Sequence, residues 1–127
     1  MKDVVRTESA PAPFQGAPYS QAIRANGLVF VSGQLSLKPG AKELSAGDIA
    51  SQTEQVFANL RAILEEAGTS LDNLVKTTVF LQDLGDFAAM NEVYAKHVGD
   101  RPPARSTVEV AKLPSGALVE IEAIATV

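Results

Sequence analysis

Three charged residues in the last quarter of the sequence are the best candidates for chemistry. Arg105 follows two prolines and opens a strand-like run, and Glu120 and Glu122 alternate in a later run, "LVEIEAIAT". A guanidinium offers a planar fork that binds a carboxylate through two parallel hydrogen bonds. A nearby glutamate can orient or deprotonate a water molecule. This combination of residue types indicates binding of an anionic substrate and attack on it by water.

The same residues also have a purely structural explanation. Because the two runs are close in sequence and joined by a short turn, we expect them to pair as antiparallel strands. A register that sets Arg105 opposite Glu122 sets Thr107 opposite Glu120, with all four side chains on one face, whereas a slip of one residue separates them. An exposed cross-strand ion pair is worth less than about 1 kcal/mol. The spacing alone favours the ion pair over the carboxylate-binding site.

A second cluster of candidates lies in the segments "GAPYSQA" and "VFVSGQ". Ser32 and Gly33 interrupt an otherwise apolar strand, which is typical of a β-bulge or of a backbone that a ligand approaches closely. Tyr19 follows a Gly-Ala-Pro turn, and an amphipathic ring there suits a loop contact, a subunit contact or a pocket wall. Asn91 lies in a helical stretch beside its apolar stripe, a place where surface residues are commoner than ligand contacts.

Composition excludes several other kinds of site. The chain has no cysteine and one histidine, so thiol chemistry and a metal site built from several histidines of one chain are excluded. His97 lies with Phe87, Met90 and Tyr94 on the apolar stripe of a helix, where we expect a structural role. With 11 basic and 15 acidic residues the net charge is −4, which argues against nucleic acid or an anionic membrane as partner. No signal peptide or membrane span is visible, so we expect a cytoplasmic enzyme or binding protein.

Five strands and two helices must position these residues in what we expect to be one domain, residues 1–127. Asn26 and Gly27 predict a type I′ hairpin between strands at about 20–25 and 28–35. Ser45 with Asp48 predicts a capping box for a helix that ends near Gly68. Further strands are expected at about 73–84, 105–110 and 118–126, and a second helix at about 87–98.

The order strand-strand-helix-strand-helix-strand-strand predicts an α+β fold, a mixed sheet with both helices packed on one face. Alternate residues from Ala117 to Ala125 form an apolar face that suits the underside of the helices. The opposite face of the same strand is half polar. A half-polar sheet face in a small domain invites a second subunit.

The segments taken together resemble the reactive-intermediate deaminase (Rid, or YjgF) family. The resemblance rests on "GAPYSQA", "VFVSGQL", "LVKTTVFLQDLGDFAAMNEVY", "PPARSTVEVAKLP" and "VEIEAIA", which span nearly the whole chain. It implies a chorismate-mutase-like α+β fold and a homotrimer with pockets at the subunit interfaces. It also implies hydrolysis of 2-imino acids or their enamines, such as 2-iminobutanoate and 2-iminopropanoate, to 2-oxo acids and ammonia, with no cofactor and no metal.

Carried over residue by residue, the resemblance implies that Arg105 binds the substrate carboxylate and Glu120 positions the attacking water. The pocket would be lined by Tyr19, Ser32, Gly33 and Asn91, and Thr107 would contribute mainly through its backbone. Many members of the family carry cysteine at the position of Thr107, so no proposed step here requires a thiol. The presence of both Arg105 and Glu120 favours the catalytic branch of the family.

Two other functions stay open from the sequence. Some relatives are credited with ribonuclease or translation-inhibitor activity, but the acidic charge balance and 6% aromatic residues give little support for RNA binding. A non-catalytic trimer that binds a ligand and regulates a partner could use the same Arg105 clamp.

Overall fold

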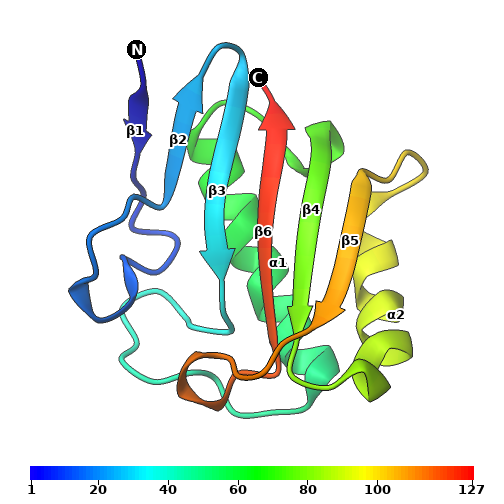
Figure 1. The fold of residues 1–127 in the computed structure, drawn as a ribbon. Coiled ribbons are helices and arrows are strands. Elements are labelled where there is room, and N and C mark those ends of the chain that lie inside the picture. The colour runs from blue at the N-terminus through cyan, green and yellow to red at the C-terminus, as the bar shows by residue number, and fades with distance from the viewer.

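The computed structural model describes residues 1–127 as a six-stranded sheet and two helices, with four short 3₁₀ turns. Both helices lie behind the sheet in the view of Figure 1, so they cover a single face of it. This arrangement confirms the predicted α+β class. Neither helix is both long enough and apolar enough to cross a membrane. The elements are β1 (Asp3–Val5), β2 (Ala22–Ala25), β3 (Leu28–Gln34), α1 (Ile49–Glu66), β4 (Leu74–Leu81), α2 (Phe87–Val98), β5 (Ala104–Glu109) and β6 (Val119–Thr126).

The sheet order is β1-β2-β3-β6-β4-β5, so the prediction that the last two strands pair with each other is wrong. β5 pairs only with β4, in parallel, because α2 carries the chain back across the sheet between them. β6 enters between β3 and β4 and is antiparallel to both. The burial of the strands explains this order. β6 buries a fully apolar face and takes a central place, whereas β5 has no buried residue and lies at the edge.

Two local predictions at the N-terminal side also need correction. The strand β1, three residues long and antiparallel to β2, was not predicted, because three residues are too few to show a period of two. The residue that caps α1 is Asp48 rather than Ser45, since the Asp48 carboxylate accepts a hydrogen bond from the Ser51 backbone N–H at 2.9 Å. The Asn26-Gly27 turn is confirmed, with both residues at positive φ.

The core lies between the sheet and the helices, and the other face of the sheet is uncovered in the single chain. α1 contributes its apolar stripe, and Phe57, Leu60 and Ile63 are fully buried. On the uncovered face Phe30 of β3 is 42% exposed.

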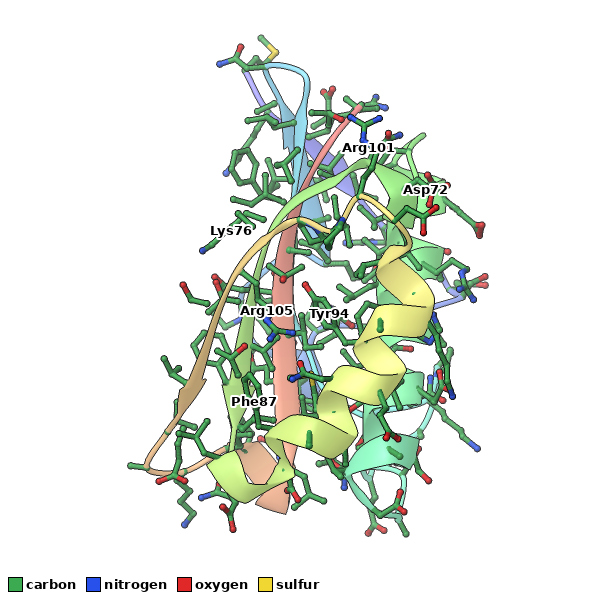
Figure 2. All side chains as sticks on the ribbon, turned by 90° about the vertical axis from the view of Figure 1, so that its right-hand side faces the viewer. Asp72, Lys76, Phe87, Tyr94, Arg101 and Arg105 are labelled. Atoms are coloured by element: carbon green, nitrogen blue, oxygen red, sulfur yellow. The ribbon has the colours of Figure 1, made fainter.

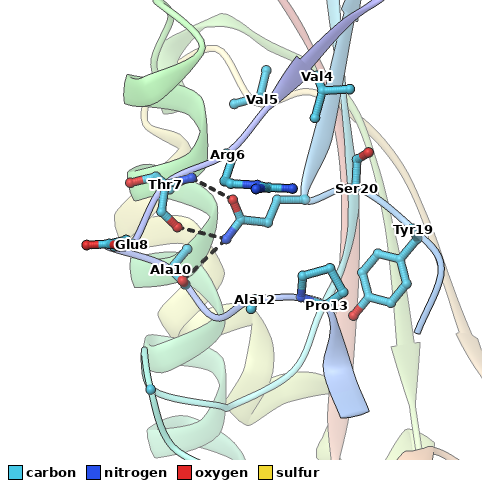
Figure 3. A pocket seen from close by; sticks show the side chains of 12 residues that line it. Val4, Val5, Arg6, Thr7, Glu8, Ala10, Ala12, Pro13, Tyr19 and Ser20 are labelled. Atoms are coloured by element: carbon cyan, nitrogen blue, oxygen red, sulfur yellow. Dashed lines mark hydrogen bonds between the residues drawn. The ribbon is translucent and has the colours of Figure 1, made fainter. Parts of the chain in front are cut away.

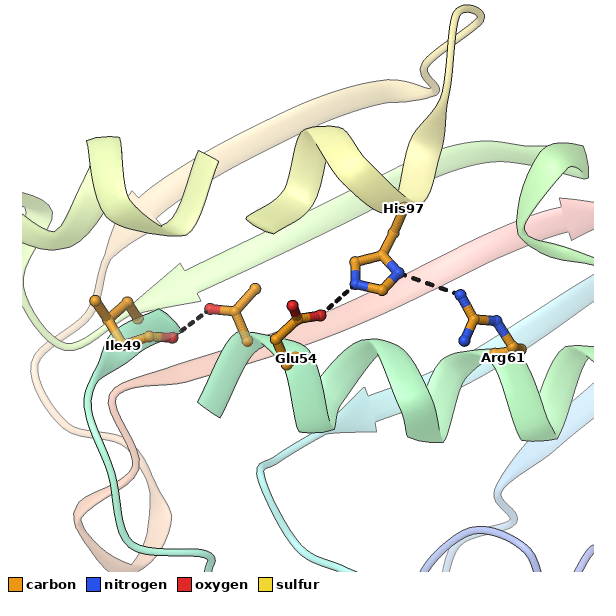
Figure 4. Close-up of polar contacts among 5 residues, drawn as sticks. Ile49, Glu54, Arg61 and His97 are labelled. Atoms are coloured by element: carbon orange, nitrogen blue, oxygen red, sulfur yellow. Dashed lines mark hydrogen bonds and ion pairs between the residues drawn. The ribbon is translucent and has the colours of Figure 1, made fainter. Parts of the chain in front are cut away.

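His97 fastens the two helices together, as its place on the apolar stripe predicted. Its ring stacks on Phe57 of α1 at 4.6 Å between centroids, with the planes 6° apart. Figure 4 shows the imidazole between two side chains of α1, with Nε2 2.5 Å from a Glu54 carboxylate oxygen and Nδ1 3.3 Å from Arg61. Because a guanidinium only donates, the Arg61 contact requires Nδ1 to accept and Nε2 to carry the proton.

We expect His97→Ala to lower the free energy of unfolding by about 1–3 kcal/mol, because it removes a ring stack and two polar contacts between α1 and α2. Urea unfolding at fixed protein concentration measures the change. Lys96→Ala, at an exposed position one residue earlier on α2, is the matched control. If both variants unfold at the same urea concentration as the unaltered protein, His97 does not fasten the helices.

Candidate functional site

The guanidinium of Arg105 lies between β5 and α2, on the helix-covered face of the sheet. Figure 2 shows it beside Tyr94, with Phe87 further along the same helix. Its Nη1 donates a hydrogen bond to Asn91 Oδ1 at 2.8 Å. Its Cζ lies 4.6 Å from the ring centroid of Tyr94 and 5.5 Å from that of Phe87. Three residues of one helix face therefore hold this cation, and none of them carries a negative charge.

The predicted contact between Arg105 and the two glutamates does not exist within the chain. Thr77 of β4 is the register partner of Arg105, whereas the partners of Glu122 and Glu120 are Thr78 and Phe80. Since successive residues of a strand point to opposite faces, Arg105 and both glutamates lie on opposite sides of the sheet. No carboxylate lies within ion-pair distance of Arg105. The prediction of a cross-strand ion pair is wrong, because the strand expected at about 73–84, β4, lies between β5 and β6.

Glu120 points to the uncovered face and lies against Gly33 of β3. A Cβ atom placed on Gly33 would be only 2.0 Å from Glu120 Oε2, so any larger residue would displace the carboxylate. Burial raises the pKa of Glu120 above the ordinary value of a glutamate, and the charge of Glu122 raises it further. A carboxylate whose pKa is raised is a stronger proton acceptor once ionised.

Ser32 and Gly33 form a bulge, which confirms the structural explanation of the pair, whereas the approach of a ligand stays a prediction. The register between β3 and β6 shifts between Val31 and Gln34, which leaves Ser32 and Gly33 without partners in the ladder. The group that approaches Gly33 is the carboxylate of Glu120 from the same chain. The Ser32 hydroxyl donates to the Ser20 carbonyl oxygen at 2.6 Å. The bulge thus joins β3 to the segment that carries Tyr19.

Tyr19 is 42% exposed and lies at the rim of this half of the site. Its hydroxyl accepts a hydrogen bond from the Phe14 backbone N–H. Its ring lines both a small hollow beside Gly33 and a cavity of about 550 Å³ under the N-terminal segment, which Figure 3 shows. That cavity contains neither Arg105 nor Glu120. The buried Gln21 amide fixes its wall by bonding Thr7, Ala10 and Pro11.

Thr107 follows Arg105 on the same face of β5, with Val79 of β4 as its register partner. Its Oγ1 is buried without a hydrogen-bond partner. A hydroxyl in this condition contributes volume rather than polar contacts. The position therefore suits any side chain of similar size, a cysteine included.

Two residues around Arg105 were not predicted as part of the site. Phe87 and Tyr94 had been assigned to the core stripe of α2, but their spacing with Asn91 puts all three on one helix face. The sequence shows that these three residues share a helix face. That this face contacts Arg105 follows only from the pairing of β4 with β5. No three His, Asp or Glu side chains gather closely enough to hold a metal ion.

The predicted residues thus form two groups on opposite faces of the sheet. The group on the helix side can bind an anion and contains Arg105, Asn91 and Thr107. The group on the uncovered side can accept a proton and orient water, and contains Glu120, Gly33 and Ser32, with Tyr19 at its rim. One chain therefore does not bring the two groups together.

Comparison with known proteins finds relatives along the whole chain. Residues 7–127 match the family described as Endoribonuclease L-PSP. A RutC family protein of Pyrococcus horikoshii is 53% identical over 125 residues, which cover 98% of both chains. Reactive Intermediate Deaminase A, chloroplastic, of Arabidopsis thaliana is 50% identical over 98% of this chain and 66% of its own.

Solved structures agree with the fold. TdcF of E. coli with bound serine superimposes with a TM-score of 0.88 at 38% identity and covers 98% of both chains. The YjgF gene product of E. coli gives a TM-score of 0.87 at 42% identity. These neighbours confirm the expected YjgF-like, chorismate-mutase-like α+β fold.

We expect Gly33→Ala to lower the free energy of unfolding by up to about 1 kcal/mol, because the new methyl group must displace the flexible end of the Glu120 side chain. In a Glu120→Ala background the same substitution should cost much less, since the obstructing carboxylate is gone. Urea unfolding of the four proteins at one fixed concentration measures the difference. An equal cost in both backgrounds would contradict the close approach of Glu120 to Gly33.

Proposed function

The chain belongs to the Endoribonuclease L-PSP family, which is the family of the reactive-intermediate deaminases, and on that premise we propose that it hydrolyses 2-imino acids and their enamine tautomers to 2-oxo acids and ammonia. We propose 2-iminobutanoate and 2-iminopropanoate as its substrates. The observation that carries the proposal is the guanidinium of Arg105, which Asn91 and two aromatic rings hold without a carboxylate partner.

Arg105 would bind the substrate carboxylate. A half-buried guanidinium without a counter-ion gains more from an incoming carboxylate than one that must first give up an internal ion pair. Asn91 Oδ1 accepts a hydrogen bond from Nη1, and Cζ lies over the rings of Tyr94 and Phe87. The carboxylate would therefore bind to the remaining N–H donors of the guanidinium, which can form two parallel hydrogen bonds with it.

Glu120 would position and deprotonate the water. As the water oxygen bonds to the imine carbon, one proton of the water passes to the Glu120 carboxylate and the imine nitrogen takes up a proton from solvent, which gives a neutral carbinolamine. The proton on Glu120 then goes to the amino group, the C–N bond breaks and ammonia leaves. As the C=O bond forms, the carbinolamine hydroxyl returns its proton to solvent. An imine carbon is already electrophilic, so positioning and proton transfer are sufficient and no cofactor is needed.

The two groups would meet across a subunit contact in a homotrimer. Within one chain Arg105 and Glu120 lie on opposite sides of the sheet, so one chain cannot offer both to a single small substrate. The uncovered sheet face exposes Phe30 and Val108, each 42% exposed, which supports burial against another copy. Such a pocket would have Arg105, Asn91 and Thr107 from one subunit and Tyr19, Ser32, Gly33 and Glu120 from its neighbour.

The two alternative functions make different demands on Glu120. A ligand-binding protein needs Arg105 but no water-activating group, and TdcF with bound serine supports ligand binding in a relative. The family name points to cleavage of RNA. The experiment below separates the three functions, because only the deaminase requires both residues for turnover of an imine.

We expect the protein to accelerate formation of 2-oxobutanoate when 2-iminobutanoate is generated in situ by a threonine dehydratase. Arg105→Ala should lower kcat/KM by about 10²-fold or more, because the substrate carboxylate loses its partner. Glu120→Gln should lower kcat by about 10²- to 10⁴-fold, because it keeps the side chain's size but cannot accept the proton. Turnover is measured as 2-oxobutanoate formed above the rate without the protein.

The matched controls are Arg101→Ala and Glu92→Gln, both at exposed positions outside the site. No acceleration by the unaltered protein would disprove the deaminase function. Binding of 2-oxobutanoate without acceleration would favour the ligand-binding alternative. Cleavage of RNA that persists in Arg105→Ala would favour the ribonuclease.

A mixture of Arg105→Ala and Glu120→Gln subunits tests whether the site bridges two chains. When the two inactive variants are unfolded, mixed in equal amounts and refolded, activity should return to roughly a quarter of the normal value, because each interface draws its arginine and its glutamate from two chains independently. Each variant refolded alone is the control, and its size must be checked by gel filtration. No return of activity in a mixture that has assembled would place both residues of a site in one chain.

A further inference from the structure

Tyr94 of α2 has a contact that ordinary core packing does not require. It is buried, with 5% of its surface exposed, and the centroid of its ring lies 4.6 Å from Cζ of Arg105. A cation over the face of a tyrosine ring is attracted by the negative charge of that face. Since no carboxylate pairs with Arg105, this ring, the more distant ring of Phe87 and the Asn91 amide are the groups that restrain its guanidinium.

The ring of Tyr94 is itself held from two other sides. Its hydroxyl shares a hydrogen bond with Thr77 Oγ1 on β4, and Thr77 is fully buried. Its edge meets the face of Phe57 on α1, with centroids 5.4 Å apart and planes at 80°. Thr77 is also the register partner of Arg105. Thr77, which lies beside Arg105 in the sheet, therefore anchors the Tyr94 ring over which Arg105 lies.

The phenol of Tyr94 is suited to this place because it stays neutral. Burial raises the pKa of Tyr94 above the ordinary value of a tyrosine, and the hydrogen bond from Thr77 and the charge of Arg105 offset part of that rise. A phenolate here would neutralise the guanidinium and compete with an incoming carboxylate. A neutral ring attracts the cation through its face and leaves the edge of the guanidinium free.

We infer that Tyr94, anchored by Thr77, is a positioning residue that holds the guanidinium of Arg105 in the orientation that receives the substrate carboxylate. This inference rests on the proposed function. Arginine has four rotatable side-chain bonds, and fixing them only when substrate arrives would cost binding free energy. Stacking on a ring that is already fixed removes much of that cost beforehand. Tyr94 acts through Arg105 and does not touch the reacting atoms.

The decisive variant is Tyr94→Leu, which fills the core but removes the aromatic face. We expect KM for 2-iminobutanoate, and the dissociation constant of 2-oxobutanoate measured by calorimetry, to rise about 3- to 30-fold, the range expected from the strength of a cation–π contact. We expect kcat per folded protein to stay within about 3-fold, because a contact to the carboxylate is made equally in the ground and transition states.

A merely structural role gives a different pattern. If Tyr94 only stabilised the core, its loss would reduce the fraction of folded protein and lower the apparent kcat at constant KM. Val93→Ala is the matched control, since Val93 is buried on the same helix and does not stack on Arg105. It should destabilise the protein and leave KM and the dissociation constant unchanged.

A second variant keeps the test decisive if Tyr94→Leu does not fold. Thr77→Val keeps the ring but releases its hydroxyl, so it should raise the same two constants in the same direction by a smaller factor. Unchanged constants in whichever of the two variants folds would overturn the inference.

The two measurements also separate this inference from the proposed function. If the unaltered protein binds 2-oxobutanoate but does not hydrolyse the imine, the deaminase is disproved, and the calorimetric ratio alone decides the role of Tyr94. If it binds no 2-oxobutanoate and shows no measurable KM, both are overturned.

Discussion

The placement of β4 between β5 and β6 decides on which side of the sheet each functional side chain lies. β4 is parallel to β5 and antiparallel to β6. Its side chains alternate between the two faces of the sheet, and their register partners in β5 and β6 alternate with them. Register partners lie on the same face of a sheet, so Arg105 faces the helices with Thr77, and Glu120 lies on the uncovered face with Phe80. A shift of one residue in either ladder would bring the two charges to the same face.

This separation has an electrostatic consequence. A guanidinium and a carboxylate within reach of each other would pair, and the pair would lower the pKa of the glutamate and occupy the arginine. On opposite faces neither happens, so Arg105 keeps an unpaired charge and burial can raise the pKa of Glu120. Within one chain the sheet therefore prevents these two groups from pairing with each other.

Local patterns were sufficient to predict most of the elements but not their pairing. The stripe of α1, the Asn26-Gly27 turn and the alternation of β6 are visible within a few residues, and all of them are found in the structure. Which strand lies next to β5 depends on α2 carrying the chain across the sheet, and this is a property of the whole fold. The ion pair between Arg105 and Glu122 was therefore predicted from nearness in sequence and is wrong.

In the candidate site too, the sequence was sufficient to identify single residues but not their neighbours in space. Arg105 and Glu120 were identified by their chemistry and by resemblance, whereas Tyr94 and Phe87 were assigned to the core because a stripe cannot reveal what it packs against. The close approach of Glu120 to Gly33 was also hidden, since the two are 87 positions apart in the chain and meet only because β3 pairs with β6.

Each half of the proposed site is fixed by its own chain before any assembly. On one face the bulge at Ser32 and Gly33 makes room for the Glu120 carboxylate, and on the other Tyr94 and Asn91 hold Arg105. Groups that are already oriented lose little conformational freedom when they meet a substrate. In the proposed trimer, association would bring together two groups of side chains that are already ordered. The free energy of association would then not be needed to order either group.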